Sequence, residues 1–82
     1  MQQYVGTYEL APTFSIVISV RENKIFGVAT GQPEVQLFPY SETDFFLKVV
    51  KAEIIFAKDE KGKVTGLTLH QGGRKIPGKK VK

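Results

Sequence analysis

The sequence has no cysteine, no tryptophan and a single histidine, His70, among its 82 residues. Without cysteine there is no disulfide, no thiolate zinc site and no cysteine nucleophile. One histidine with scattered carboxylates rarely forms a catalytic metal site. We therefore expect no metal site and no cofactor, and the chain has to be held together by packing alone.

Long apolar runs are also missing. No segment approaches the ~18 apolar residues of a membrane-spanning helix, and the chain does not begin with a positively charged leader. The sequence thus predicts no membrane span, and it leaves the compartment open. A length of 82 residues fits one domain or a piece of one. Size scaling predicts that roughly 63% of the unfolded-chain surface is buried on folding, which is enough for a small core.

Helical periodicity is absent, and strand periodicity takes its place. In residues 14–20, Phe14, Ile16, Ile18 and Val20 share one face, while serines lie on the other. Turn residues recur at short intervals, most clearly in the hairpin signals at 59–62 and 72–73. These patterns predict strands near residues 4–10, 13–21, 24–30, 34–40, 44–50, 52–58, 63–70 and 74–77, with no helix.

Short strands joined by short loops favour a single all-β domain, an antiparallel meander of seven or eight strands that closes into a barrel or curls into a partly open one. Pro39 and Pro77 lie inside strand-like runs, so those strands are expected at edges or bulges and closure is expected to be incomplete. Gly66 interrupts the alternation of its strand and predicts a β-bulge there.

Charge is concentrated at the end of the chain. Residues 72–82 hold five basic side chains and no acid, whereas residues 1–71 are close to neutral. We interpret residues 78–82 as a basic tail that is solvated and frayed. A specific nucleic-acid site is not expected, because no aromatic residue stands among these charges.

Apolar residues occupy both faces of the predicted sheet. One face would fill a small barrel with Phe14, Ile16, Ile18, Val20, Ile25, Ala29, Val35, Leu37, Phe45, Leu47, Val49, Ile54 and Phe56. The other face carries Val17, Phe26, Val28, Phe38, Tyr40, Phe46 and Ile55, which we take as the candidate interaction surface. Three interpretations follow: a ligand inside the barrel, a partner docked on the second face, or a strand register wrong by one residue. We favour docking, since large inward side chains leave little space inside.

Four segments resemble one known family: residues 4–10, 29–33, 45–49 and 62–74, with Thr-Gly-Leu-Thr-Leu-His-Gln at 65–71 the most specific part. The family is the small domain of unknown function found C-terminal to β-lactamase-like, penicillin-recognising serine hydrolases. The resemblance covers essentially the whole chain. It implies that residues 1–82 form one accessory domain with a lipocalin-like or calycin-like barrel, in the C-terminal part of a larger bacterial hydrolase. A periplasmic or extracellular location is compatible with it.

Catalytic residues of that hydrolase class are not found in the chain. The class uses a Ser-x-x-Lys nucleophile, and the residues three positions after Ser15, Ser19 and Ser41 are not lysine. We interpret His70 as structural, because any triad would depend on it alone. The sequence therefore favours a non-catalytic accessory domain that packs on or regulates a serine hydrolase domain in the same chain, or that mediates homo-oligomerisation. The alternative is a small barrel that binds an apolar ligand.

Overall fold

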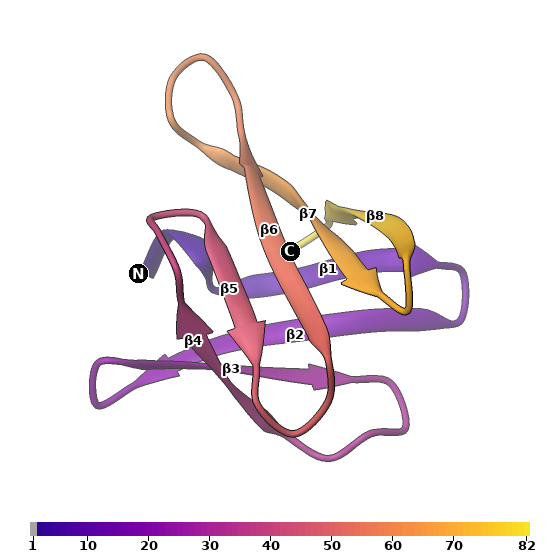
Figure 1. The fold of residues 1–82 in the computed structure, drawn as a ribbon. Coiled ribbons are helices and arrows are strands. Elements are labelled where there is room, and N and C mark those ends of the chain that lie inside the picture. The colour runs from indigo at the N-terminus through magenta and orange to yellow at the C-terminus, as the bar shows by residue number, and fades with distance from the viewer. Residues whose placement is uncertain (1) are drawn as a thin grey trace.

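The computed structural model describes residues 2–82 and is almost entirely β (Figure 1). The short 3-10 helix η1 precedes eight strands, so the predicted all-β class is confirmed. The elements are η1 Gln2–Tyr4, β1 Gly6–Ala11, β2 Phe14–Arg21, β3 Lys24–Ala29, β4 Val35–Pro39, β5 Asp44–Leu47, β6 Ala52–Lys58, β7 Val64–Gln71 and β8 Arg74–Lys80. Over these residues, no helix has the length and apolar character needed to cross a bilayer.

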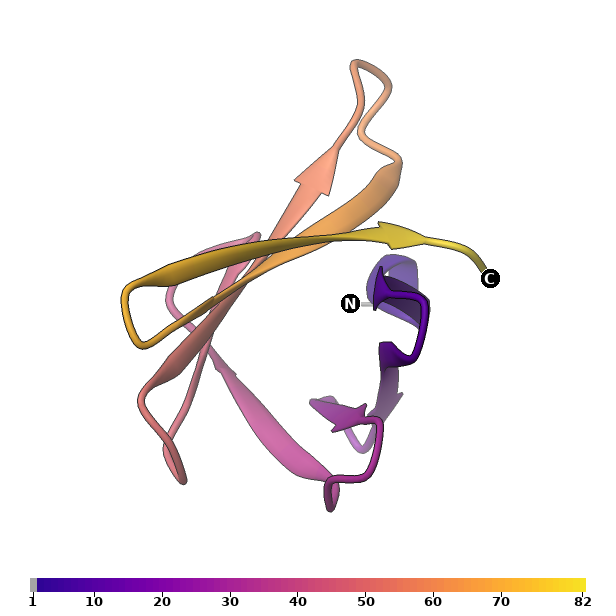
Figure 2. The same ribbon diagram turned by 90° about the vertical axis from the view of Figure 1, so that its right-hand side faces the viewer.

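Each strand pairs antiparallel with the next one along the chain, and β8 returns to β1. The eight strands therefore close into a barrel, whose outline is seen in Figure 2. The hairpin that joins β6 to β7 projects beyond the body of the barrel (Figures 1 and 2). The prediction of a meander closed into a barrel is confirmed.

The tight turns follow from residues that tolerate positive φ. Gly72 and Gly73 have φ of 59° and 78°, and Gly62 has φ of 80°. In the β6–β7 hairpin, the Asp59 carboxylate accepts hydrogen bonds from the N–H groups of Lys61 and Lys63, each at 2.9 Å. A short acceptor side chain followed by a left-handed glycine is what such a hairpin loop requires. Both predicted hairpins are confirmed.

The bulge predicted at Gly66 is present in β7. Gly66 lies opposite Ala57 and Val64 lies opposite Lys58, so Thr65 is the extra residue. The bulge lets Val64 and Leu67 both point inward. A Cβ at Gly66 would collide with the carbonyl oxygen of Gly78 in β8, which explains why glycine stands there.

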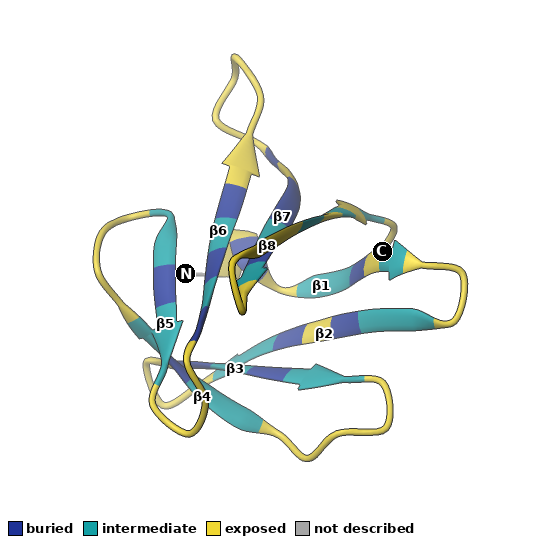
Figure 3. Ribbon diagram, turned by 45° about the vertical axis from the view of Figure 1, so that its right-hand side comes forward, coloured by how far each residue is buried: buried dark blue, intermediate teal, exposed yellow. Residues whose placement is uncertain are grey.

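The barrel interior contains the predicted apolar face except for one residue, and it also contains six core residues that were not on the predicted list. Seven of the predicted inward residues are buried and five are half-buried, as the banding along the strands in Figure 3 reflects. Val49 was predicted to face inward but is 71% exposed, because β5 ends at Leu47 and Val49 lies in a turn. The complete core is Tyr4, Tyr8, Ile16, Ile18, Ile25, Leu37, Phe45, Ala52, Ile54, Phe56, Val64, Leu67 and Leu69.

Four aromatic side chains form a plug in one part of the barrel interior. The Tyr4 ring stacks on Phe56 with centroids 4.2 Å apart, and Tyr8 and Phe45 meet Phe56 edge-on at 5.7 and 5.5 Å. The hydroxyl of Tyr8 donates to the Tyr4 carbonyl at 2.7 Å, and that of Tyr4 donates to the carbonyl of Glu42. Burial, with a smaller contribution from Tyr4, raises the pKa of Tyr8 to about 12. Two tyrosines absent from the predicted core thus plug the barrel with their hydroxyls satisfied.

The closing seam between β1 and β8 is short. It pairs Tyr8 with Lys80 and Glu9 with Lys79, while residues from Arg74 to Gly78 pair only with β7. Pro77, which has no N–H, lies in that part of β8. The barrel is nevertheless closed, which corrects the expectation that Pro39 and Pro77 would leave it partly open. The seam between β1 and β8 covers only the end of β8.

The last residues of the chain are not frayed, which corrects the interpretation of the basic tail. Lys79 and Lys80 belong to β8. Beyond them, the N–H of Val81 donates to the Thr7 carbonyl at 2.8 Å, and the N–H of Thr7 donates to the Lys82 carbonyl at 3.3 Å. The charges point to a solvated end, yet the backbone of this segment closes the barrel.

Deleting residues 79–82 should destabilise the domain. The deletion removes the β1–β8 seam and its continuation, which we expect to cost about 2 kcal/mol at a typical net contribution per hydrogen bond. For a domain of this size that corresponds to a fall in Tm of roughly 8–16 °C by circular dichroism. As a control, the variant Lys79→Gln, Lys80→Gln, Lys82→Gln keeps the backbone and should melt close to the wild type. Equal melting of the truncated and full chains would contradict the seam.

Candidate functional site

The structure places the seven residues of the candidate interaction surface on the outside of the barrel. None of them is buried, and Val17 and Tyr40 are 46% and 61% exposed. The strand registers are therefore not slipped by one residue, because a slip would exchange the two faces. The set is Val17, Phe26, Val28, Phe38, Tyr40, Phe46 and Ile55, and its role in an interaction stays a prediction.

The part of this surface on β3 is partly covered by the domain itself. The guanidinium carbon of Arg21 lies 4.0 Å from the centroid of the Phe26 ring. The same guanidinium donates two hydrogen bonds to the Glu34 carboxylate, one of them at 3.0 Å, and this hydrogen bonding holds the pKa of Glu34 below its usual value. Arg21 thus shields one face of Phe26, so this aromatic side chain already has a partner.

Three aromatic side chains gather on the outer face of β4 and β5. Phe38 and Phe46 are direct cross-strand neighbours with ring centroids 5.7 Å apart, and the Tyr40 ring lies 4.7 Å from that of Phe46. Lys48 places its ammonium 4.3 Å from the centroid of Phe38 and covers one face of this ring, as Arg21 does for Phe26. We call Phe38, Tyr40 and Phe46 the aromatic cluster. It is the largest group of outward rings that the structure brings together in the candidate surface.

The aromatic cluster continues into a polar row across the sheet. Phe38 lies opposite Phe46, Phe46 opposite Glu53, Glu53 opposite His70, and His70 opposite Lys75. These five residues, one from each strand from β4 to β8, form what we call the outer row. The hydroxyl of Tyr40 donates to the Glu53 carboxylate at 3.1 Å, and this hydrogen bond is the main reason that the pKa of Tyr40 is raised.

A groove of about 570 Å³ runs beside the outer row. Tyr40 and Phe46 line one side, and the hairpin between β7 and β8 lines the other. Its cationic residues are Lys51, Arg74 and Lys75. The sequence alone does not predict this groove. Its lining residues come from several strands, and they lie together only because of how β5, β6, β7 and β8 are paired.

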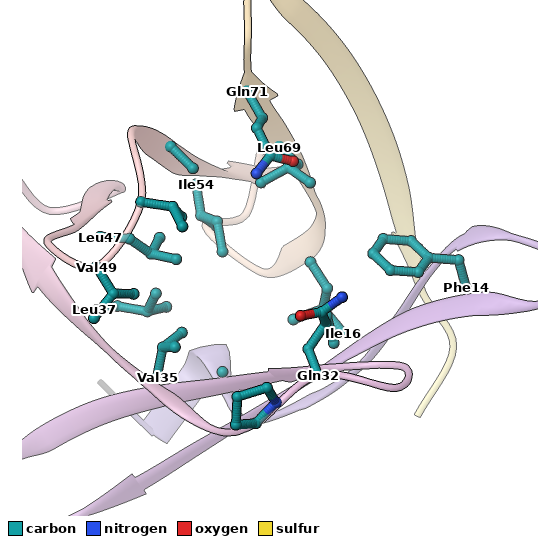
Figure 4. Close-up of a pocket in the computed structure, with 15 residues that line it drawn as sticks. Phe14, Ile16, Gln32, Val35, Leu37, Leu47, Val49, Ile54, Leu69 and Gln71 are labelled. Atoms are coloured by element: carbon teal, nitrogen blue, oxygen red, sulfur yellow. The ribbon is translucent and has the colours of Figure 1, made fainter.

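A second hollow lies in the barrel interior. Its volume is about 290 Å³, and buried side chains from β2, β4, β6 and β7 line it (Figure 4). Those side chains are Ile16, Leu37, Ala52, Ile54 and Leu69. Exposed residues that also line the hollow are Gln32, Pro33, Val49, Val50 and Gln71. The expectation that large inward side chains leave little space thus holds for the aromatic plug and fails here.

His70 lies half-buried in the outer row. Its neighbours in register are Glu53 and Lys75. Within residues 2–82, the structure holds no cluster of three or more histidine, cysteine or carboxylate side chains that could bind a metal ion. The candidate site thus has an aromatic part and a cationic part on the outer face, and a separate apolar hollow.

Comparison with known families decides the assignment. A family model described as "Domain of unknown function (DUF3471)" matches residues 1–80. The chain belongs to this family. A segment of 58 residues of the domain, 71% of the chain, is 33% identical to "Penicillin-binding protein 4*" of Bacillus subtilis (strain 168) and spans 13% of that protein. No solved structure gives a significant match.

These matches confirm the coarser part of the resemblance. The domain is one of unknown function that is related to a region of a penicillin-binding protein, as an accessory domain of a β-lactamase-like protein would be. Because the chain spans about an eighth of that relative, most of the relative lies outside the matched domain.

Proposed function

We propose that the domain docks on a β-lactamase-like serine hydrolase domain of the same polypeptide and shapes or regulates that domain's active site. The observation that supports the proposal is the aromatic cluster of Phe38, Tyr40 and Phe46 on the outer face of β4 and β5. Tyr40 is 61% exposed and packs beside the half-buried rings of Phe38 and Phe46, and contiguous apolar patches on the outside of a soluble domain often mark interaction sites. Aromatic residues also carry much of the binding energy of protein interfaces.

Physical linkage strengthens this interpretation. A docked surface gains about 25 cal/mol for each Å² of apolar area removed from water, but free association has to offset the loss of translational and rotational freedom. Two domains of one polypeptide avoid most of that cost, because the linker holds them at a high effective concentration. A modest cluster of rings is then sufficient to hold the accessory domain in place.

The test mixes the domain described here with the hydrolase domain that the proposal places in the same polypeptide, at up to millimolar concentration, the range of effective concentration that a short linker provides. We expect calorimetry to show association, and the double variant Tyr40→Ala, Phe46→Ala to weaken it by roughly thirtyfold in Kd, as loss of a hot spot does. The matched control is Lys61→Ala, Lys63→Ala, two exposed residues of the projecting β6–β7 hairpin that lie outside the candidate interaction surface. It should bind normally, and melting curves should show that both variants fold.

Three results would contradict the proposal. The wild-type domain does not bind the hydrolase domain, or the Lys61, Lys63 variant loses binding while the aromatic variant keeps it. A wild type that forms a stable dimer by light scattering, with no affinity for the hydrolase domain, would instead assign the aromatic cluster to homo-oligomerisation.

The interior hollow supports a second candidate function, the binding of a small apolar ligand. Its lining is almost wholly apolar at its buried residues, and its volume of about 290 Å³ is too large for a packing defect. Two glutamine amides, of Gln32 and Gln71, are available for a polar group of the ligand. An apolar compound with one polar group is the class that fits.

A fluorescent probe distinguishes a binding cavity from an idle one. Anilinonaphthalene sulfonate should bind the wild type, and Ala29→Leu should lower its affinity at least about tenfold by filling the hollow with a side chain at its wall. Ala57→Leu makes the same change at an exposed position of β6 that does not line the hollow, and it should leave probe binding unchanged. Absence of a probe signal in the folded wild type, or an equal signal in both variants, would remove the ligand-binding candidate.

A further inference from the structure

The outer row has two chemically different ends. Its aromatic end holds Phe38 and Phe46, with Tyr40 packed on Phe46. Its cationic end holds Lys75, and Arg74 and Lys51 line the same groove. Glu53 lies between the two ends and already accepts a hydrogen bond from Tyr40.

The cations of the groove lack carboxylate partners. Across residues 2–82, the one ion pair joins Arg21 to Glu34, which do not line this groove. Lys51, Arg74 and Lys75 are all exposed. Several unneutralised cations beside a single carboxylate give a positive potential that favours an anionic partner.

The spacing of the two ends selects an extended chain. Neighbouring strands lie about 4.8 Å apart, so the three strand intervals from Phe46 to Lys75 span roughly 14 Å. In an extended peptide that rises about 3.4 Å per residue, two residues four positions apart are separated by nearly the same distance. They also project to the same side, since side chains alternate with a period of two.

We propose that the outer row and its groove receive an extended acidic segment that crosses strands β5 to β8. The segment carries an aromatic or large apolar residue, which packs on Tyr40 and Phe46, and an aspartate or glutamate four residues away, which meets Arg74 and Lys75. This inference rests on the proposed docking function and names the chemistry of the partner segment. It adds that the cationic half of the groove, and not the aromatic cluster alone, selects the partner.

Short synthetic peptides test the spacing directly. The probe is an acetylated and amidated peptide, Gly-Phe-Ser-Thr-Ser-Glu-Gly, titrated into the nitrogen-labelled 82-residue chain. We expect amide shifts concentrated around Phe46, Glu53, His70 and Lys75. A peptide with lysine in place of glutamate, and one with glutamate moved one position closer to phenylalanine, should each bind about tenfold more weakly.

Charge reversal provides the matched protein variants. Arg74→Glu, Lys75→Glu should reduce peptide affinity at least about tenfold, and raising the salt concentration should weaken wild-type binding. The control is Lys61→Glu, Lys63→Glu, which makes the same change of charge on the projecting β6–β7 hairpin. It should bind the peptide like the wild type. Neither pair forms an ion pair in the structure, and all four residues are exposed, so both variants should fold.

Each remaining outcome overturns the inference. Equal affinity of the domain for the three peptides, or no amide shift at the outer row, would contradict binding of an acidic segment there. Tighter binding of an oligonucleotide or polyphosphate than of the spaced peptide would make the groove a general anion surface.

The two proposals can also fail separately. Hydrolase-domain binding that is insensitive to Arg74→Glu, Lys75→Glu overturns the acidic segment and leaves the docking function standing. Spacing-dependent peptide binding without any affinity for the hydrolase domain supports the segment chemistry and overturns docking on that domain.

Discussion

A small barrel has room for apolar side chains on only one face of its sheet, and this constraint governs the whole domain. Strand alternation sends Ile16, Ile18, Leu37 and Ile54 to the interior, where they are buried. The same alternation sends the aromatic cluster to the exterior, where the domain has no further layer to cover it. The inner face therefore provides the core and the outer face carries the proposed docking surface, and a one-residue change of register would exchange the two faces.

The interior is itself divided. Tyr4, Tyr8, Phe45 and Phe56 form a plug in which both tyrosine hydroxyls find carbonyl acceptors. The hollow lies outside this plug, and none of the four rings of the plug lines it. A chain without disulfides thus has a densely packed aromatic centre, while the hollow leaves part of its lining without packing partners. The backbone of residues 79–82 completes the barrel by joining its last strand to its first.

Local sequence patterns predicted most of the fold. They did not predict the features that depend on pairing between distant parts of the chain. The strand faces, the hairpins and the bulge at Gly66 follow from alternation and from turn residues a few positions apart. The burial of Tyr4 does not, because it lies in a 3-10 turn where no alternation applies. The role of the basic end was misjudged, since its charges indicate solvation while its backbone partners lie near the start of the chain. The members of the candidate surface were predicted, but the outer row needs four strand registers that no local pattern supplies.

The domain belongs to a family of unknown function and is related to a region of a penicillin-binding protein. We therefore propose that its outer face meets another protein domain. Hydroxyl-radical footprinting of the domain joined in one polypeptide to the proposed hydrolase domain, compared with the isolated domain, tests the central claim most directly. We predict that oxidation of Tyr40 and Phe46 falls severalfold in the joined protein, while that of Phe26, shielded by Arg21 in both, stays unchanged. Unaltered oxidation of the aromatic cluster, or protection confined to Phe26, would contradict the claim that this face is where the domain meets its partner.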